Sequence, residues 1–132
     1  MAIEYRTIKE FTCEQLERLF LSVGWDSGKY PEKLRIAMRN YASVFTAWDG
    51  DRLIGLISVM DDGIMTAYIQ YVLVDPEYHH NGIGHELLNM VKENYKDYMR
   101  IVLVAYSDRV SFYESCGMKP GVGKTPMFIE QF

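Results

Sequence analysis

The chain has 132 residues and a mass of 15.4 kDa, a size that predicts one domain over residues 1–132, because two halves would each be too small for a stable core. Hydrophobic residues make up 48% of the sequence and charged residues 24%, which excludes a disordered chain. Lys and Arg number 14 against 18 Asp and Glu. The resulting net charge of −4 predicts no general attraction to nucleic acid or to an anionic membrane.

The sequence also indicates a compartment. Its N-terminus lacks a basic segment followed by an apolar one, and the longest apolar stretch, residues 53–60, is far too short to span a membrane. Cys13 and Cys116 lie far apart and show no metal-ligand spacing. We therefore expect two free thiols, with a single disulfide as the alternative, in a cytoplasmic protein that binds no metal.

In chain order, the first elements are a strand and two helices. Residues 3–8 predict a short strand. Thr12 and Gln15 have the spacing of a capping box at the start of a helix, and Gly24 ends that helix. Pro31 has the position that proline prefers at the start of a second helix.

The middle of the chain predicts a β-meander. Strands over residues 44–48 and 52–60 flank an Asp-Gly-Asp turn, which is a strong hairpin signal. A second turn at residues 61–63 leads into a strand over residues 67–74. The end of that strand is apolar at nearly every position, so we expect it to be buried on both faces.

The pattern then changes to alternating helices and strands. Apolar residues from Ile83 to Tyr95 predict an amphipathic helix, and the β-branched run at residues 100–105 predicts a parallel strand after this crossover. A short helix follows and ends at Gly117, and residues 118–132 predict two further strands. The expected fold class is α/β, of the α+β type: a mixed, mainly antiparallel sheet with helices on both faces.

The loop before the helix at Ile83 carries the strongest functional signal. Gly82 and Gly84 leave the backbone N–H groups of the helix start unblocked by side chains. Together with the helix dipole, such N–H groups form an anion site suited to a pyrophosphate. The alternative is that the two glycines only permit a tight turn into the helix.

Two motifs resemble those of the GNAT superfamily of acetyl-CoA-dependent N-acetyltransferases. In that family the strand–loop–helix segment usually reads V-x-P-x-[Y/H]-[R/Q]-x-x-G-x-[G/A], and a later helix reads F/L-Y-x-x-x-G-F. The matching residues are Val74, Pro76, Tyr78, Gly82 and Gly84 in the first motif, and Phe112, Tyr113, Gly117 and Met118 in the second. The resemblance extends over essentially the whole chain, and it is greatest to small bacterial proteins similar to the plastid arylalkylamine acetyltransferases of plants.

The resemblance implies acetyl-CoA as cosubstrate, bound where two parallel strands splay apart. The pantetheine arm would pair with the exposed strand edge, and an N–H near Leu73 would polarise the thioester carbonyl. The residues that the resemblance assigns to the cofactor are Val72, Leu73, Val74, His79, His80, Asn81, Gly82, Ile83, Gly84, Ser107 and Tyr113. His79 departs from the usual Gln or Arg of the family, and Tyr106-Ser107 replaces a more common Asn.

The implied reaction is transfer of the acetyl group to a primary amine, on a small molecule or a protein, by direct attack on the thioester. Tyr113 would protonate the departing thiolate, whereas the alternative reading makes it an apolar filler. A non-catalytic acetyl-CoA-binding sensor or scaffold is the competing function. The base remains open among Asp26, Asp61, Asp62, Gln70 and Tyr71, and Trp25, Tyr30 and Tyr68 are candidates for an acceptor pocket; structural roles are an alternative for all of them.

The aromatic-rich segment 127–132 bears on assembly. If it forms a strand, its exposed edge would be a liability in a monomer. We therefore expect a homodimer, with burial of this segment in its own chain as the alternative.

Overall fold

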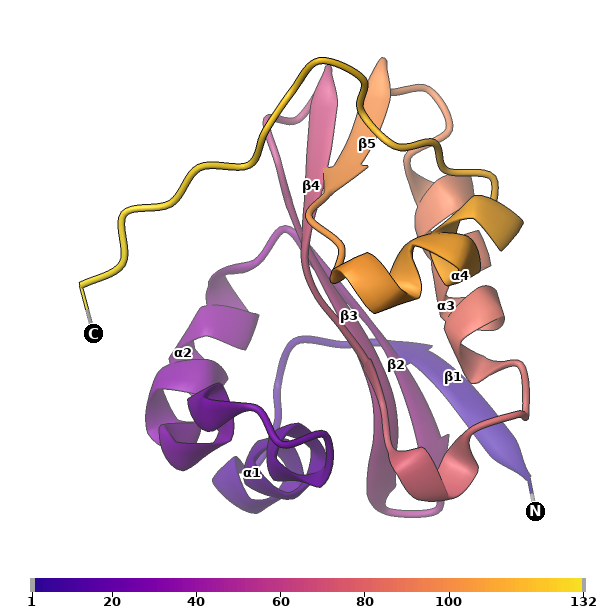
Figure 1. The fold of residues 1–132 in the computed structure, drawn as a ribbon. Helices are drawn as coiled ribbons and strands as arrows, with labels where there is room; N and C mark the ends of the chain where they lie inside the picture. Colours follow the sequence, from indigo (N-terminus) through magenta and orange to yellow (C-terminus); the bar gives the residue numbers. More distant parts are fainter. Residues whose placement is uncertain (1, 132) are drawn as a thin grey trace.

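The computed structural model describes residues 2–131, which form a five-stranded sheet with helices on both faces (Figure 1). In spatial order the strands are β1 (Ile3–Thr7), β2 (Ser43–Asp49), β3 (Arg52–Asp61), β4 (Thr66–Val74) and β5 (Arg100–Leu103). The helices are α1 (Cys13–Ser22), α2 (Pro31–Asn40), α3 (Ile83–Asn94) and α4 (Val110–Ser115), with short 3-10 turns η1 (Asp26–Lys29), η2 (Pro76–Tyr78) and η3 (Ser107–Arg109). The predicted fold class is confirmed.

Local sequence signals account for the order of the strands. Tight turns join β2 to β3 and β3 to β4, so these neighbours pair antiparallel, as β1 and β2 do. β4 and β5 pair in parallel because α3 carries the chain back between them. The capping box of α1 is present, with Thr12 Oγ1 accepting from the N–H of Gln15 and the Gln15 side chain accepting from the N–H of Thr12.

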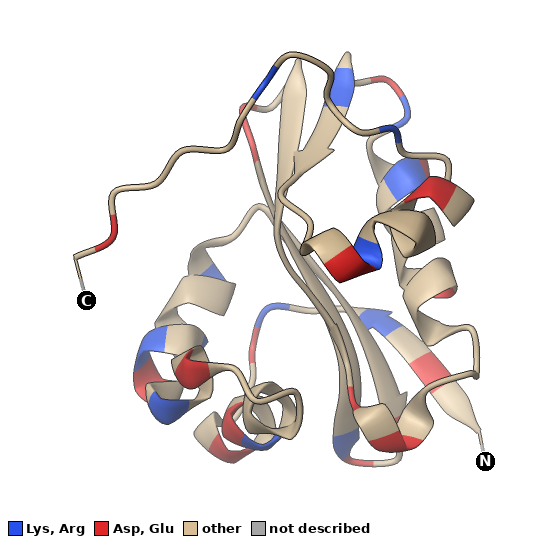
Figure 2. Ribbon diagram, in the orientation of Figure 1, with Lys and Arg blue, Asp and Glu red and all other residues tan. Residues whose placement is uncertain are grey.

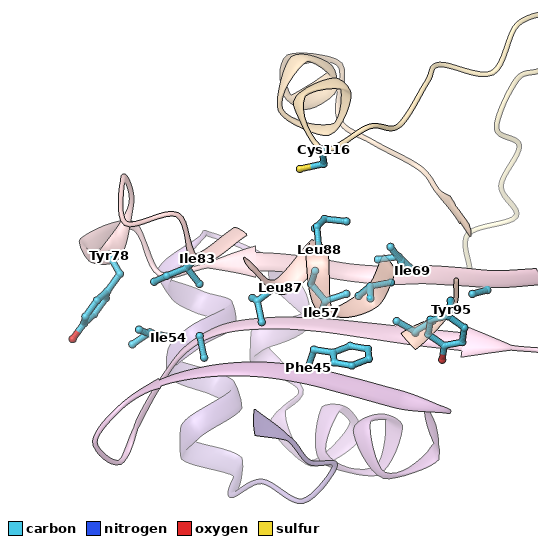
Figure 3. Close-up of a cluster of buried hydrophobic side chains, with 14 residues drawn as sticks. Phe45, Ile54, Ile57, Ile69, Tyr78, Ile83, Leu87, Leu88, Tyr95 and Cys116 are labelled. Carbon is cyan, nitrogen blue, oxygen red and sulfur yellow. The ribbon is translucent and has the colours of Figure 1, made fainter. Parts of the chain in front are cut away.

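The two faces of the sheet have separate cores. α1 and α2 cover one face, and α3 and α4 lie over the other (Figure 1). Figure 3 shows the cluster beneath α3, where Ile83 and Leu87 meet the sheet. α3 approaches closely because of Gly55 on β3: a Cβ there would lie 3.0 Å from Ile83 Cγ2 and 3.2 Å from Leu87 Cδ1. Gly55 therefore sets the position of the first turn of α3.

The predicted strands of the C-terminal segment are wrong. Residues 118–131 contain a turn at Val122–Gly123 but no strand, and Phe132 lies outside the described residues. Pro120 and Pro126 cannot donate a ladder hydrogen bond, and glycine weakens a strand, so the segment has little local tendency to pair. It runs away from the body of the protein (Figure 1), and residues 119–131 are all exposed.

Three smaller features complete the comparison with the sequence. β5 ends at Leu103 rather than at residue 105. Cys13 and Cys116 are both free thiols, as expected. No helix within residues 2–131 combines the length and apolar character needed to cross a bilayer.

A buried carboxylate fixes the chain where β4 ends. Asp75 is 2% exposed; its side chain accepts from the N–H of Glu77 at 2.9 Å and pairs with Arg18 at 3.1 Å and Arg52 at 3.3 Å. Burial alone would raise the pKa of Asp75, but the Glu77 N–H and the two arginines outweigh it and hold the pKa below its usual range. Asp75 thus ties the end of β4 to α1 and to β3.

We expect Asp75→Asn to lower the free energy of unfolding by about 1–3 kcal/mol at pH 7, because it weakens charge-assisted hydrogen bonds in a buried site. The lowered pKa means that the carboxylate contributes fully above the ordinary Asp range. Its contribution is lost as the pH falls through the pKa in the folded state. Urea unfolding at several pH values should therefore show the two proteins converging in acid. Glu77→Gln is the matched control, since its exposed ion pair with Arg52 should contribute less than about 1 kcal/mol; an equal loss in both variants would contradict the assignment.

Candidate active site

The parallel strands β4 and β5 separate halfway along β4. They pair from Thr66 with Arg100 to Ile69 with Leu103, and then diverge (Figure 1). The divergence begins at an irregularity in β4: Tyr71 faces Ser58 of β3 and Ile69 faces Val59, so Gln70 is an extra residue. Within residues 2–131, β4 beyond this bulge pairs with β3 alone. Its other edge is open, as the resemblance implies.

The register shows which backbone groups face that open edge. The N–H of Asp75 donates to Ile54 O at 2.8 Å, so alternate residues of β4 bond to β3, and Leu73 is one of them. Val72 and Val74 lie between these positions and direct their N–H and C=O groups outward. The expected donor near Leu73 is therefore Val72 or Val74 rather than Leu73 itself, whose buried side chain packs in the core beneath α1.

The loop after η2 is braced by its own side chains. Asn81 Nδ2 donates to Tyr78 O at 2.9 Å and to His79 O at 3.3 Å. His79 Nε2 donates to Val74 O at 3.2 Å, so an outward-facing carbonyl of β4 already has a hydrogen-bond donor. His80 and Gly82 both have positive φ, 68° and 71°, which for His80 is an uncommon conformation held by the tight loop.

The start of α3 presents unpaired backbone donors. The first helical bond runs from Glu86 N–H to Gly82 O, which leaves the N–H groups of Ile83, Gly84 and His85 without partners inside the helix. Ile83 contributes only its N–H, because its side chain is buried in the core. A Cβ on Gly82 would meet no atom within 4 Å. Figure 2 shows no Lys or Arg on this loop, so an anion here would be held by backbone dipoles.

Gly84 has a structural role that the sequence did not reveal. A Cβ there would lie 2.9 Å from Phe112 Cζ, so the missing side chain lets α4 pack against α3. His85 joins the same contact: its ring lies 4.9 Å from that of Phe112, and its Nε2 donates to Ser115 Oγ at 3.0 Å. Tight packing and an unblocked helix start are thus combined at one glycine.

Tyr113 lies on α4, and Ser107 lies exposed in η3, on the segment that follows β5. Burial raises the pKa of Tyr113, and the positive charge of Arg109 only partly opposes it. The phenol therefore keeps its proton throughout the neutral pH range. No hydrogen bond of its hydroxyl is recorded within residues 2–131.

Aromatic side chains cover the diverging strands on the α1 side. The ring of Trp25 lies 6.1 Å from Tyr71 of β4 and 6.3 Å from Tyr106, which follows β5. Trp25 was expected at an acceptor pocket, whereas Tyr106 was not, because only the fold brings its loop to Trp25. These three rings form one wall beside the open edge.

The acidic candidates for a base all have hydrogen-bond or ion-pair partners. Asp62 accepts from the N–H groups of Ile64, Met65 and Thr66, Asp61 accepts from the Tyr95 hydroxyl, and Asp26 pairs with Lys29. The other two candidates, Gln70 and Tyr71, lie at the bulge of β4. Residues 2–131 contain no group of three or more His, Cys, Asp or Glu side chains that could hold a metal ion.

The Acetyltransferase (GNAT) domain model matches residues 11–124 of this chain. The chain belongs to the GNAT acetyltransferase family. An uncharacterized, ycf52-like N-acetyltransferase from Prochlorococcus marinus is 35% identical over 119 residues, which cover 86% of this chain and 66% of that protein. Among solved structures, a GNAT-family acetyltransferase from Streptococcus pneumoniae is 27% identical with a TM-score of 0.84, over 98% of both chains.

A protein of unknown function from Staphylococcus aureus has the same fold, with a TM-score of 0.84, 22% identity and coverage of 98% of this chain and 100% of that one. Membership of the GNAT family implies acetyl-CoA as cosubstrate. The outward-facing groups of β4 and the unpaired donors of α3 suit the amide-containing arm and the pyrophosphate of that molecule.

We expect acetyl-CoA to raise the melting temperature of the protein, with a stabilisation of about 2.7 kcal/mol at a hundredfold excess over Kd. Gly82→Val should remove most of this shift, because its side chain would fill the open space above the helix start. It should also cost about 1–2 kcal/mol of stability through strain at positive φ.

Gly50→Val is the matched control for that experiment. Gly50 also has a positive φ, 60°, and open space around it, but it lies in the turn between β2 and β3. This variant should lose stability to a similar extent and keep the acetyl-CoA shift, measured by differential scanning fluorimetry. A full shift in Gly82→Val would place the phosphate site elsewhere.

Proposed function

We propose that this chain is an acetyl-CoA-dependent N-acetyltransferase that acetylates a primary amine on a small molecule or a protein. The observation that carries the proposal is the open edge of β4, which leads directly into the unblocked start of α3. Two sets of backbone groups, the outward ones of Val72 and Val74 and the unpaired N–H groups of residues 83–85, are thereby available to an extended ligand that has amides at one end and phosphates at the other. Family membership supports acetyl transfer as the reaction.

In this proposal the pantetheine arm pairs with Val72 and Val74 as a short additional strand. His79 must first release Val74 O, and its ring is then available to donate to the diphosphate. The N–H groups at the start of α3 hold the pyrophosphate, while His80, Asn81 and Ser107 lie on the segments that border it. Binding through backbone groups explains how the loop can lack the usual Arg or Gln.

The chemical step is a direct attack by the neutral amine on the thioester carbonyl. A C–N bond forms, and the oxyanion of the tetrahedral intermediate is stabilised by an outward N–H of β4, from Val72 or Val74. The C–S bond then breaks and the thiolate takes a proton from Tyr113. The proton that the attacking nitrogen loses as the amide forms returns through solvent to the Tyr113 oxygen. Only about one alkylamine in a few thousand is neutral at pH 7, so water beside Gln70 and Tyr71 must carry away the amine proton.

The acceptor would enter on the side of Trp25, Tyr71 and Tyr106. This aromatic wall offers an apolar surface close to the bulge where the thioester would lie. The same proposal includes a homodimer that works in the cytoplasm and needs neither metal, nucleic acid nor membrane.

Free thiol release tests the proposal directly. The protein is incubated with acetyl-CoA and a panel of primary amines, and CoA thiol is measured with a chromogenic disulfide reagent. Release that depends on an amine would support the proposed transferase. Binding of acetyl-CoA without release, for every small amine and lysine peptide tested, would favour a sensor or scaffold instead.

We expect Tyr113→Phe to lower kcat by roughly 100-fold or more, because it deletes the proton donor and keeps the ring. Affinity for acetyl-CoA should change little, since the lost interaction develops in the transition state. If ionisation of the phenol lowers kcat of the wild type at alkaline pH, the raised pKa of Tyr113 places this decrease above the usual tyrosine range. The pH profile of Tyr113→Phe should show no such decrease.

Tyr98→Phe serves as the control, because Tyr98 lies in the connection between α3 and β5 and its ring makes an edge contact with that of Tyr95. Its kcat should match that of the wild type. A kcat within about threefold of wild type in Tyr113→Phe, with chemistry rate-limiting, would remove this hydroxyl from the mechanism.

A further inference from the structure

Within residues 2–131 three polar side chains are buried, and two of them lie at the two ends of the part of β4 beyond its bulge. Asp75 is 2% exposed and fixes the end of that strand, whereas Ser58 and Thr46 are 0% exposed. Ser58 lies on β3 directly opposite the bulge, where it faces Tyr71. Because a buried hydroxyl is costly unless it is hydrogen-bonded, the position of Ser58 calls for a partner.

The bulge supplies that partner. Two residues of β4, Gln70 and Tyr71, oppose the single residue Ser58, since Val59 already pairs with Ile69. Such an irregularity breaks the one-to-one match of N–H and C=O groups along the ladder. Ser58 Oγ provides an additional acceptor at this point, and the N–H of Tyr71 donates to it at 3.2 Å.

A second contact holds the Ser58 hydroxyl from α2. Tyr41 forms the C-cap of that helix; its ring lies 6.5 Å from that of Tyr71, and its side chain is hydrogen-bonded to that of Ser58. Burial raises the pKa of Tyr41 to about 12, and the bond to Ser58 only partly opposes this rise, so the phenol stays neutral at physiological pH. The Ser58 hydroxyl thus joins the end of α2 to the backbone of the bulge.

We propose that Ser58 is a positioning residue for acetyl transfer: by holding the N–H of Tyr71, its hydroxyl fixes the bulge and keeps the outward N–H of Val72 aimed at the thioester carbonyl. This inference rests on the proposed function, in which an outward N–H of β4 stabilises the oxyanion. Val72 follows the bulge directly, whereas Val74 lies next to Asp75, which is anchored separately. Ser58 should therefore affect the reacting end of acetyl-CoA more than its binding as a whole.

The size of the effect follows from the geometry that oxyanion stabilisation needs. A donor must lie within about 3 Å of the developing charge, and removing one such donor lowers kcat roughly 100-fold or more. Ser58 does not touch the substrate and acts through Tyr71 and Val72. Its loss would displace the donor without removing it, so we expect a smaller decrease, of about tenfold.

Ser58→Ala tests this role, with Thr46→Val as the matched control. Thr46 is equally buried, and its hydroxyl donates to Arg6 O at 3.0 Å and accepts from Trp48 Nε1 at 2.8 Å, but it lies on β2, away from the bulge. Both variants should lower the melting temperature, because each deletes a buried hydroxyl. Only Ser58→Ala should lower kcat, by about tenfold, with KM for acetyl-CoA within about threefold of wild type. The rates are measured as CoA thiol release, with the panel amine that the wild type acetylates fastest.

Amide exchange provides a readout that does not depend on catalysis. NMR of the ligand-free protein should show the N–H of Tyr71 exchanging with solvent about tenfold faster, or more, in Ser58→Ala than in wild type, and at a rate within about threefold of wild type in Thr46→Val. A kcat within about threefold of wild type in Ser58→Ala, an equal decrease in Thr46→Val, or unchanged exchange at Tyr71 would overturn the proposal. If the wild type releases no thiol with any amine, the proposed function fails, and exchange at Tyr71 alone decides whether Ser58 holds the bulge.

Discussion

The separation of β4 from β5 after Ile69 is the constraint on which the candidate active site depends. Buried backbone N–H and C=O groups need partners, so a strand inside a sheet can lose a neighbour only where something else satisfies it. The extra residue Gln70 ends the pairing after Ile69, and the groups of Val72 and Val74 then face outward. His79 partly meets this demand through its bond to Val74 O. The fold thus holds a vacant strand position shaped for a ligand with amide groups.

The surrounding structure keeps that vacant position in line with the helix start. Asp75 ties the end of β4 to Arg18 and Arg52, and Gly55 lets Ile83 settle directly on the sheet. Strand edge and helix N-terminus are consequently both fixed to β3, and the strand end is also fixed to α1. Because the loop between them carries no Lys or Arg, the proposed phosphate site relies on backbone dipoles, whose direction depends on this anchoring.

Features set by neighbouring residues could be predicted from the sequence, whereas features set by distant contacts could not. The capping box at Thr12, the hairpin turns, α3 and the parallel β5 follow from local patterns, and the structure confirms them. The outward role of Val72 and Val74 depends on the register with β3, which spacing alone does not reveal. The contact of Trp25 with Tyr106 and that of Gly84 with Phe112 join segments far apart in sequence. Residues 118–131 form no strands for a related reason: apolar alternation indicates a strand but does not supply a neighbouring strand with which it can pair.

Two open edges of this sheet, those of β4 and β5, differ in how the sequence protects them from pairing with another chain. The edge of β4 must stay free for a ligand, and Pro76 and the bond from His79 just beyond it discourage pairing with another chain. The edge of β5 carries no such protection: its residues Ile101 to Leu103 are apolar, and only Arg100 is charged. The protected edge of β4 lies beside the loop that leads to α3, whereas the unprotected edge of β5 lies on the outer side of the sheet.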